Sequence, residues 1–392
     1  MKWYENSKAF ELTKTLVESS DLSYAQISDI ISNMFDVECS PEAIRKKMSR
    51  SGVKKSFIAQ RFEQDVQIER MRQELDYYRK MYKGTVRMSA FEAEILDRIE
   101  KKNIVLPAVK APSESKTPSS EKAVFLWSDW HIGETVSFES MGGLNEYNFD
   151  IFTERFNTLV STSSNIVANK LSAFGVRDIY IFHLGDVVSG MIHDELVRTA
   201  DKNVVDCIFD GAAVVAAGIR ELCQTFEHVY FVGIPGNHGR FTKKKEHKDR
   251  YVNWDYVFYK TVGLMLKDQP NLTLKASRSI WALEEVAGFR FLLLHGDDIK
   301  GWSGIPWYGI DRAVSKLTAL FASSNRFFDY VCLAHFHSSG TFDHTGAEII
   351  LNGSLVGGDE YAASLFLNNK PKQRIFGVHP EHGKTWEYNI YL

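Results

Sequence analysis

Five short hydrophobic runs, each followed closely by Asp, Asn or His, constrain the fold of this chain more than any other feature. The runs occupy residues 124–127, 179–182, 229–232, 291–294 and 330–333. Their β-branched and aromatic composition, bounded by Gly and polar residues, predicts buried strands. Side chains that follow the carboxyl ends of strands in an open α/β sheet meet in one crevice, where such sheets bind ligands. The pattern therefore predicts an α/β fold with a ligand site at this edge.

The residues that follow the five runs are of the types that hold divalent metal ions. Carboxylate, imidazole and amide oxygen groups suit ions such as Mn²⁺, Fe²⁺ or Zn²⁺. A carboxylate can also bridge two ions, which lie about 3.5–4 Å apart in sites that bind a phosphoryl group and activate water. The sequence therefore predicts a two-metal centre. Its candidate ligands are Asp129, His131, Asp186, Asn237, His295, His335 and His337.

The order and spelling of these groups resemble the calcineurin-like metallophosphoesterase superfamily. The motifs Asp-x-His, Gly-Asp, Gly-Asn-His, a single His and His-x-His fall between about residues 122 and 360. The resemblance implies a four-layer α/β/β/α sandwich and two divalent ions, with Mn²⁺ expected first and Fe²⁺ or Zn²⁺ as alternatives. It implies that His238 protonates the leaving oxygen and that Asp186 bridges the ions. One ion would be held by Asp129, His131 and His337, and the other by Asn237, His295 and His335.

Two positions depart from the family pattern. Family members often carry an acidic residue after Gly-Asn-His, where this chain has Gly239 and Arg240. Some also carry an acidic residue three positions after the Gly-Asp carboxylate, where this chain has Ser189. The group that orients His238 is therefore not identified by the sequence, and the protein serine/threonine phosphatase branch is disfavoured.

The phosphoesterase motifs do not use the first hundred residues, and residues 1–58 predict a small all-α domain. A first amphipathic stretch is followed by a capping box at Ser23 and Gln26, which opens a second helix. Ser40 caps a third helix with Pro41 at its first position. Three short helices with a tight link before the third resemble a helix-turn-helix fold.

The third helix begins a cationic segment that contains no acidic residue between positions 43 and 61. A helix that enters the major groove of DNA needs such a bias, because phosphate neutralisation supplies most non-specific affinity. A solvated basic face and a docking surface for an acidic partner are the alternatives. The candidate nucleic-acid contacts are Arg45, Lys46, Lys47, Arg50, Lys54 and Lys55.

Residues 59–106 predict a helical connector, and residues 107–122 predict a flexible linker rich in Pro, Ser and Lys before a phosphoesterase domain at 123–392. The connector has coiled-coil spacing over barely two heptads, so packing within the N-terminal region and homodimerisation are both open. The formal net charge is -3, and the four cysteines form no paired motif. With no secretory or membrane-spanning pattern, we expect a cytoplasmic protein.

A second cationic segment follows the proposed acid and bears on the substrate. Arg240, Lys243, Lys244 and Lys245 are candidate contacts for a polyanionic backbone, and a solvated loop is the alternative. The catalytic motifs also resemble those of double-strand-break-repair phosphoesterase nucleases. We therefore expect a metal-dependent phosphodiesterase that hydrolyses nucleic acid, foremost DNA, by attack of a metal-activated hydroxide. The alternatives are a phosphoesterase for small molecules and a DNA-binding regulator with an inactive scaffold; the sequence does not say whether an ATPase partner takes part.

Overall fold

The chain divides into two compact units, Met1–Asp97 and Arg98–Leu392. The computed structural model describes residues 3–20, 22–53, 121–300 and 305–392. The predicted connector at 59–106, most of the predicted linker at 107–122, and the candidate contacts Lys54 and Lys55 lie outside the described residues. Among the residues that are described, no helix combines the length and the apolar character that crossing a membrane requires.

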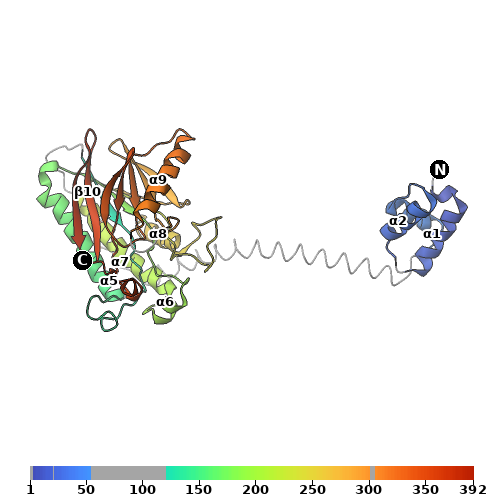
Figure 1. Ribbon diagram of the computed structural model, residues 1–392, viewed down its shortest axis with the longest axis horizontal. Helices are drawn as coiled ribbons and strands as arrows, with labels where there is room; N and C mark the ends of the chain where they lie inside the picture. Colours follow the sequence, from blue (N-terminus) through green and yellow to red (C-terminus); the bar gives the residue numbers. More distant parts are fainter. Residues whose placement is uncertain (1–2, 21, 54–120, 301–304) are drawn as a thin grey trace. The chain divides into compact units, whose positions relative to one another are not determined.

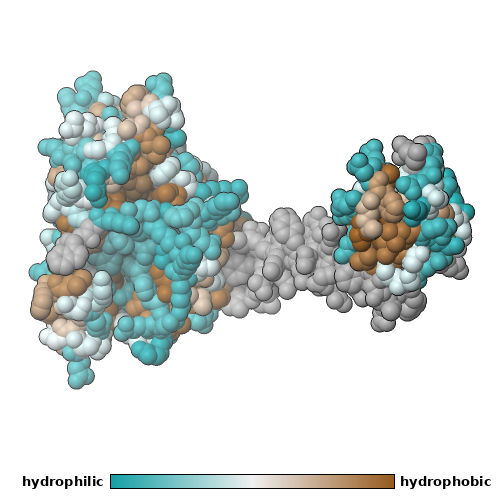
Figure 2. Space-filling view, turned by 45° about the vertical axis from the view of Figure 1, so that its right-hand side comes forward, coloured by the Kyte–Doolittle hydropathy of each residue, from teal (hydrophilic) through white to brown (hydrophobic). Residues whose placement is uncertain are grey.

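The N-terminal unit contains the three expected helices after a short 3-10 helix, η1 (Trp3–Glu5). They are α1 (Ser7–Ser19), α2 (Tyr24–Phe35) and α3 (Pro41–Arg50). The predicted capping box opens α2, and the Ser40 side chain caps α3. Buried side chains from all three helices, among them Val17, Ile31 and Ile44, form one small core. Figure 2 also shows a hydrophobic area on the visible face of this unit, flanked by hydrophilic residues.

The larger unit is built on two β-sheets rather than on a single one. The first sheet has six strands in the order β11-β10-β1-β2-β3-β4, and the second has five in the order β5-β6-β7-β9-β8. Bounds in the first sheet are β1 (Lys122–Trp127), β2 (Asp178–His183), β3 (His228–Gly233), β4 (Leu272–Ala276), β10 (Lys372–His379) and β11 (Gly383–Tyr391). Those in the second are β5 (Trp281–Val286), β6 (Phe289–Leu294), β7 (Tyr330–Leu333), β8 (Gly340–His344) and β9 (Ala347–Leu351).

All five predicted strands are present, as β1, β2, β3, β6 and β7. They do not share one sheet, because the first three lie in the six-stranded sheet and the last two in the five-stranded sheet. β1 to β4 pair in parallel, and so do β6, β7 and β9. Strand β1 begins at Lys122, one residue before the predicted start of the domain.

Helices cover the outer faces of the two sheets, and the four main ones are labelled in Figure 1. On the first sheet, α5 (Phe149–Asn165), α7 (Val204–Thr225) and α8 (Trp254–Met265) pack together. On the second, α9 (Trp307–Ala322) shares a core with β6, β7 and β9. The short helical elements are η2 (Ile166–Lys170), η3 (Ser172–Phe174), α6 (Asp194–Thr199) and α10 (Glu360–Ser364).

A continuous hydrophobic core lies between the two sheets. Leu126 and Phe182 from the first sheet belong to the same buried cluster as Phe291 and Cys332 from the second. Since each sheet also buries its other face under helices, the order of layers is helix, sheet, sheet, helix. The predicted four-layer α/β/β/α sandwich is confirmed, preceded by the predicted all-α unit.

Candidate metal centre

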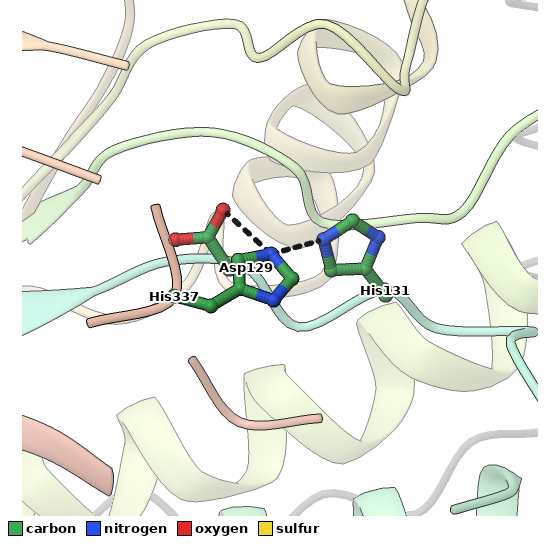
Figure 3. Close-up of side chains that lie close together, drawn as sticks. All are labelled: Asp129, His131 and His337. Carbon is green, nitrogen blue, oxygen red and sulfur yellow. Dashed lines mark hydrogen bonds and ion pairs between the residues drawn. The ribbon is translucent and has the colours of Figure 1, made fainter. Parts of the chain in front are cut away.

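The loops that leave β1, β2, β3, β6 and β7 bring the predicted metal ligands together. The first group contains Asp129, His131 and His337, whose ligand atoms all lie within 4.8 Å of one another. In Figure 3 the two imidazole rings and the carboxylate point toward one another. The Nε2 atoms of His131 and His337 are 3.1 Å apart, and His337 Nε2 lies 3.6 Å from Asp129 Oδ1.

The second group contains Asp186, His295 and His335. His295 Nε2 lies 3.0 Å from Asp186 Oδ2 and 3.0 Å from Asn237 Oδ1. A third group, made of His131, Asp186 and His238, joins the first two. Asp186 therefore stands between both groups, where the resemblance places a bridging carboxylate.

The spacing of these atoms fits divalent ions. Ligand atoms about 2.1 Å from one ion, at roughly right or tetrahedral angles, lie about 3.0–3.4 Å apart. The separations of 3.0 Å and 3.1 Å in the two groups agree with that spacing. Imidazole, carboxylate and amide oxygen donors without thiolate also match the ions expected for the site. The residues present are thus consistent with a dinuclear metal site.

Five of the seven predicted ligands adopt a left-handed backbone conformation, which is uncommon for residues other than Gly. Their φ values are 49° for Asp129 and His131, 55° for Asp186, 72° for His335 and 52° for His337. This conformation costs about 1–2 kcal/mol per residue, and such strain concentrates at functional sites. The backbone is held there by hydrogen bonds: Asp129 N donates to Gly185 O at 3.1 Å, and His335 N donates to the Asp129 carboxylate.

The glycines of the Gly-Asp and Gly-Asn-His motifs mark the place where two ligand loops touch. A Cβ at Gly185, whose φ is +95°, would lie 2.5 Å from Gly236 N. A Cβ at Gly236 would lie 2.2 Å from Asp186 Oδ1. Neither position has room for a side chain, so the two glycines allow Asp186 to approach the loop that carries Asn237.

A buried carboxylate that the sequence analysis missed ties these same loops together. Asp255 accepts hydrogen bonds from Asp186 N at 3.0 Å, Val187 N at 3.1 Å and Gly236 N at 2.7 Å. Burial and the neighbouring Asp186 raise the pKa of Asp255 to about 7, against the opposing effect of these donors. Its signal in the sequence was an acidic residue in the otherwise aromatic and apolar start of α8.

Gln373 is a second missed residue, and it supports the β1 loop. Its side chain is completely buried, accepts from Ser128 N at 2.8 Å and donates to Ser128 O at 3.1 Å. Asn352 adds a hydrogen bond to Ser128 Oγ at 2.9 Å. These contacts fix the backbone immediately before Asp129. We find no sequence signal that separates Gln373 from an ordinary strand residue.

His238 has the partner that the departures from the family pattern left open. Its Nδ1 lies 3.2 Å from the Ser189 carbonyl oxygen, to which an Nδ1–H donates. The backbone N–H of His238 donates to Asp186 Oδ1 at 2.7 Å. Burial, opposed by the charge of Asp186, lowers the pKa of His238. With Nδ1 occupied by the carbonyl, Nε2 is the atom available to a substrate.

In the second group, His295 and Asp186 stabilise each other's charges. Burial opposes a charge on His295, but the interactions with Asp186 outweigh it and raise the pKa of His295 to about 10. Burial is likewise outweighed for Asp186, whose pKa is held well below its usual value by His295 and His238. A metal ion that binds through His295 Nε2 must therefore replace a proton.

Three cations of the loop after His238 are paired with acidic residues of the same unit. Lys245 Nζ lies 2.6 Å from Asp297 Oδ2, and Arg250 Nη2 lies 2.9 Å from the same oxygen. Lys243 pairs with Asp194. Arg240 is half-buried and forms a β-bridge with Asn253, while Lys244 is exposed and makes no ion pair within the described residues.

The cations of α3 are mostly exposed. Arg45, Lys46 and Arg50 lie on the solvent side of the helix, and Lys46 pairs with Glu42 at 3.2 Å. Lys47 instead lies over the Tyr4 ring, 4.4 Å from its centroid. The predicted recognition helix therefore exists as a helix with a basic outer face, and its binding to nucleic acid stays a prediction.

Comparisons with known proteins give likeness in solved structures alone. No protein-family model matches the chain, and no curated protein matches its sequence. Vacuolar protein sorting 29 from Cryptosporidium parvum is similar at 12% identity with a TM-score of 0.29, over 66% of this chain and 86% of that one. The same protein from Entamoeba histolytica in complex with Zn²⁺ is similar at 11% identity with a TM-score of 0.27, over 68% of this chain and 99% of that one. An archaeal phosphodiesterase is similar at 11% identity with a TM-score of 0.29, over 68% of this chain and 99% of that one. At such values the chemistry of this chain must be argued from its own residues.

Proposed function

We propose that the protein is a metal-dependent phosphoesterase whose reaction takes place at the site around Asp186. The observation that carries the proposal is the pair of ligand groups joined by Asp186, with a carbonyl-oriented histidine beside them. Bound divalent ions would supply Lewis-acid stabilisation of the phosphoryl charge and a lowered pKa of water. This combination suits hydrolysis of a phosphate ester better than any other reaction class.

The chain's own side chains divide the remaining work. Asp186 is 1% exposed and holds its position through Asp255, so the site is pre-organised before substrate arrives. His238 keeps Nδ1 on a carbonyl and turns Nε2 toward the substrate, where it donates a proton to the departing oxygen. A phosphate bound nearby favours the protonated imidazole through its negative charge, which offsets the effect of burial on the pKa of His238.

We further propose that the substrate is a nucleic acid, foremost DNA. One supporting observation is the exposed basic face of α3. A second is a groove of about 440 Å³ in which the aromatic residues Tyr251 and Trp281 lie beside the cations Arg250 and Arg278. Against this, the ion pairs of Lys243, Lys245 and Arg250 already neutralise much of the nearby loop. A small-molecule diester is therefore the second candidate.

One set of assays tests both levels of the proposal. Purified protein loaded with Mn²⁺, Fe²⁺ or Zn²⁺ is offered bis(p-nitrophenyl) phosphate, p-nitrophenyl phosphate, and labelled single- and double-stranded DNA and RNA. We expect diester hydrolysis and strand cleavage, both absent from the Asp186→Ala variant. Hydrolysis of the small diester with all nucleic acids intact would contradict the nucleic-acid proposal. Two bound ions without turnover of any ester would contradict the proposal that the protein is a phosphoesterase.

The contribution of α3 is tested separately by binding. Replacing Arg45 and Lys46 by Ala should weaken DNA binding. It should also make the slope of log affinity against log salt concentration shallower by about 0.9 for each phosphate that the helix no longer neutralises. Lys8→Ala, an exposed cation on α1, is the matched control and should leave affinity and slope unchanged. Equal binding by the variant and the wild type would remove α3 from the interface.

A further inference from the structure

A buried carboxylate lies behind one of the metal ligands. Glu134 is 5% exposed, and its Oε2 lies 3.4 Å from Nδ1 of His131, which is itself 3% exposed. This Nδ1 atom has no hydrogen-bond partner among the described residues, and the carboxylate is the group that it faces. Nε2 of the same ring faces His337 at 3.1 Å, on the side of the metal site. The two nitrogens of His131 therefore point to different groups.

The turn after His131 explains how Glu134 reaches that position. Glu134 N donates to His131 O at 2.9 Å, so the chain folds back within three residues. Gly133 makes this turn with a φ of +94°, and a Cβ there would lie 2.6 Å from Cys207 Sγ. A side chain at position 133 would thus push Glu134 away from the ring that it supports.

Ser189 holds the carboxylate from the other side. Its hydroxyl donates to Glu134 Oε2 at 3.0 Å, and its carbonyl oxygen accepts from His238 Nδ1 at 3.2 Å. Ser189 stands where some members of the resembling family carry an acidic residue. Glu134, on the neighbouring loop, faces His131 and not His238, and the serine connects it to the segment that carries Asp186.

We propose that Glu134 and Ser189 are a positioning pair, in which Glu134 orients His131 toward the metal site and Ser189 aligns both Glu134 and His238. The inference rests on the proposed metal centre and adds to it two residues that touch neither substrate nor metal. A ligand histidine that donates its second N–H to a carboxylate is fixed in one tautomer and becomes more basic, and such partners change metal affinity about 10–100-fold.

The pair also links two functions through one residue. The hydroxyl of Ser189 acts on a metal ligand through Glu134, while its carbonyl acts on the proposed acid. A shift of the loop at Ser189 would disturb the metal group and His238 together. The backbone carbonyl survives any side-chain substitution, so substitutions at Ser189 separate the first effect from the second.

The test measures metal affinity, which does not depend on turnover. Metal-free protein is titrated with Mn²⁺ and with Zn²⁺ by calorimetry, and its melting temperature is measured in chelator. Glu134→Gln should lower the affinity for one of the two ions about 10–100-fold with little change in the metal-free melting temperature. Ser189→Ala should lower the affinity for the same ion about 2–12-fold, as expected for the removal of one hydrogen bond. The double variant should fall short of the product of the two effects, because the residues act in series.

Glu139→Gln, an exposed acid on the same loop, is the matched control and should bind both ions as the wild type does. Unchanged affinity for both ions in Glu134→Gln would overturn the inference, and so would a lower metal-free melting temperature with unchanged affinity. The proposed function is tested independently by the wild type, which must bind two ions and hydrolyse an ester whatever Glu134 does.

Discussion

The two ligand groups of the metal centre are supported by different chemistry. In the first group, His131 turns Nδ1 toward the Glu134 carboxylate at 3.4 Å. In the second, Nδ1 of His295 lies 2.8 Å from the Leu184 carbonyl oxygen. Burial and the nearby Asp359 raise the pKa of Glu134 to about 8, and once ionised this carboxylate makes a ligand imidazole more basic than a neutral carbonyl does. The two ions should therefore bind with different affinities although their ligands look alike.

Each group combines two buried ligands with one partly exposed histidine, which is His337 in the first group and His335 in the second. Access to solvent therefore does not distinguish the groups, and the partners of their buried histidines do. Asp186 lies between both groups, so its replacement should affect both ions.

The largest effect is expected from Asp186→Ala. Because the carboxylate stands between the groups, its loss should remove both ions and leave no measurable hydrolysis. Metal content by elemental analysis checks this result, with circular dichroism as the control for folding. Retention of two ions per chain would contradict the bridging position, and retention of one would show that the groups are independent.

His238→Ala should leave both groups intact and still remove much of the rate. General acids contribute about 10²–10⁴-fold, and the ligand contacts of His131 and His295 do not pass through the His238 side chain. The measurement is kcat with a poor leaving group, with a p-nitrophenyl leaving group as the reference that needs less protonation. A variant equally slow on both would argue that His238 binds substrate or metal instead.

The clustering of the candidate ligands was predictable from the sequence because each one follows a hydrophobic run whose strand identity is clear. The four-layer order came from the family resemblance, whereas strand patterns alone did not divide β1, β2 and β3 from β6 and β7. The supporting residues were missed for a physical reason. Glu134 and Asp255 act only after a turn or a helix places them against a distant loop, and their burial depends on tertiary contacts. The left-handed conformation of Asp129 and His131 also has no local signature.

Removal of the ions should reveal the difference in ion affinity between the two groups as a change in melting temperature. A ligand present at about 100 times its dissociation constant stabilises a protein by about 2.7 kcal/mol. Stepwise addition of Mn²⁺ to metal-free protein should therefore raise the melting temperature in two stages, with the tighter ion acting first. Differential scanning fluorimetry across the titration distinguishes this from one stage. A single transition that saturates with two ions together would show that the groups bind as one cooperative unit.

The smallest effect is expected from the cationic loop, which is tied to the second group and not to the first. Arg250 is 14% exposed and binds Asp297, which is 9% exposed and lies two positions after His295. Arg250→Ala should leave Asp297 paired with Lys245 alone and change the affinity of the second ion by a few-fold, since a partly exposed pair contributes about 1 kcal/mol or less. Lys275→Ala breaks an ion pair with Glu284, between strands β4 and β5, and serves as the control. Calorimetry of both variants measures the affinity for each ion. A change in affinity for the first ion only, or for neither ion, would show that the loop does not support the His295 side of the centre.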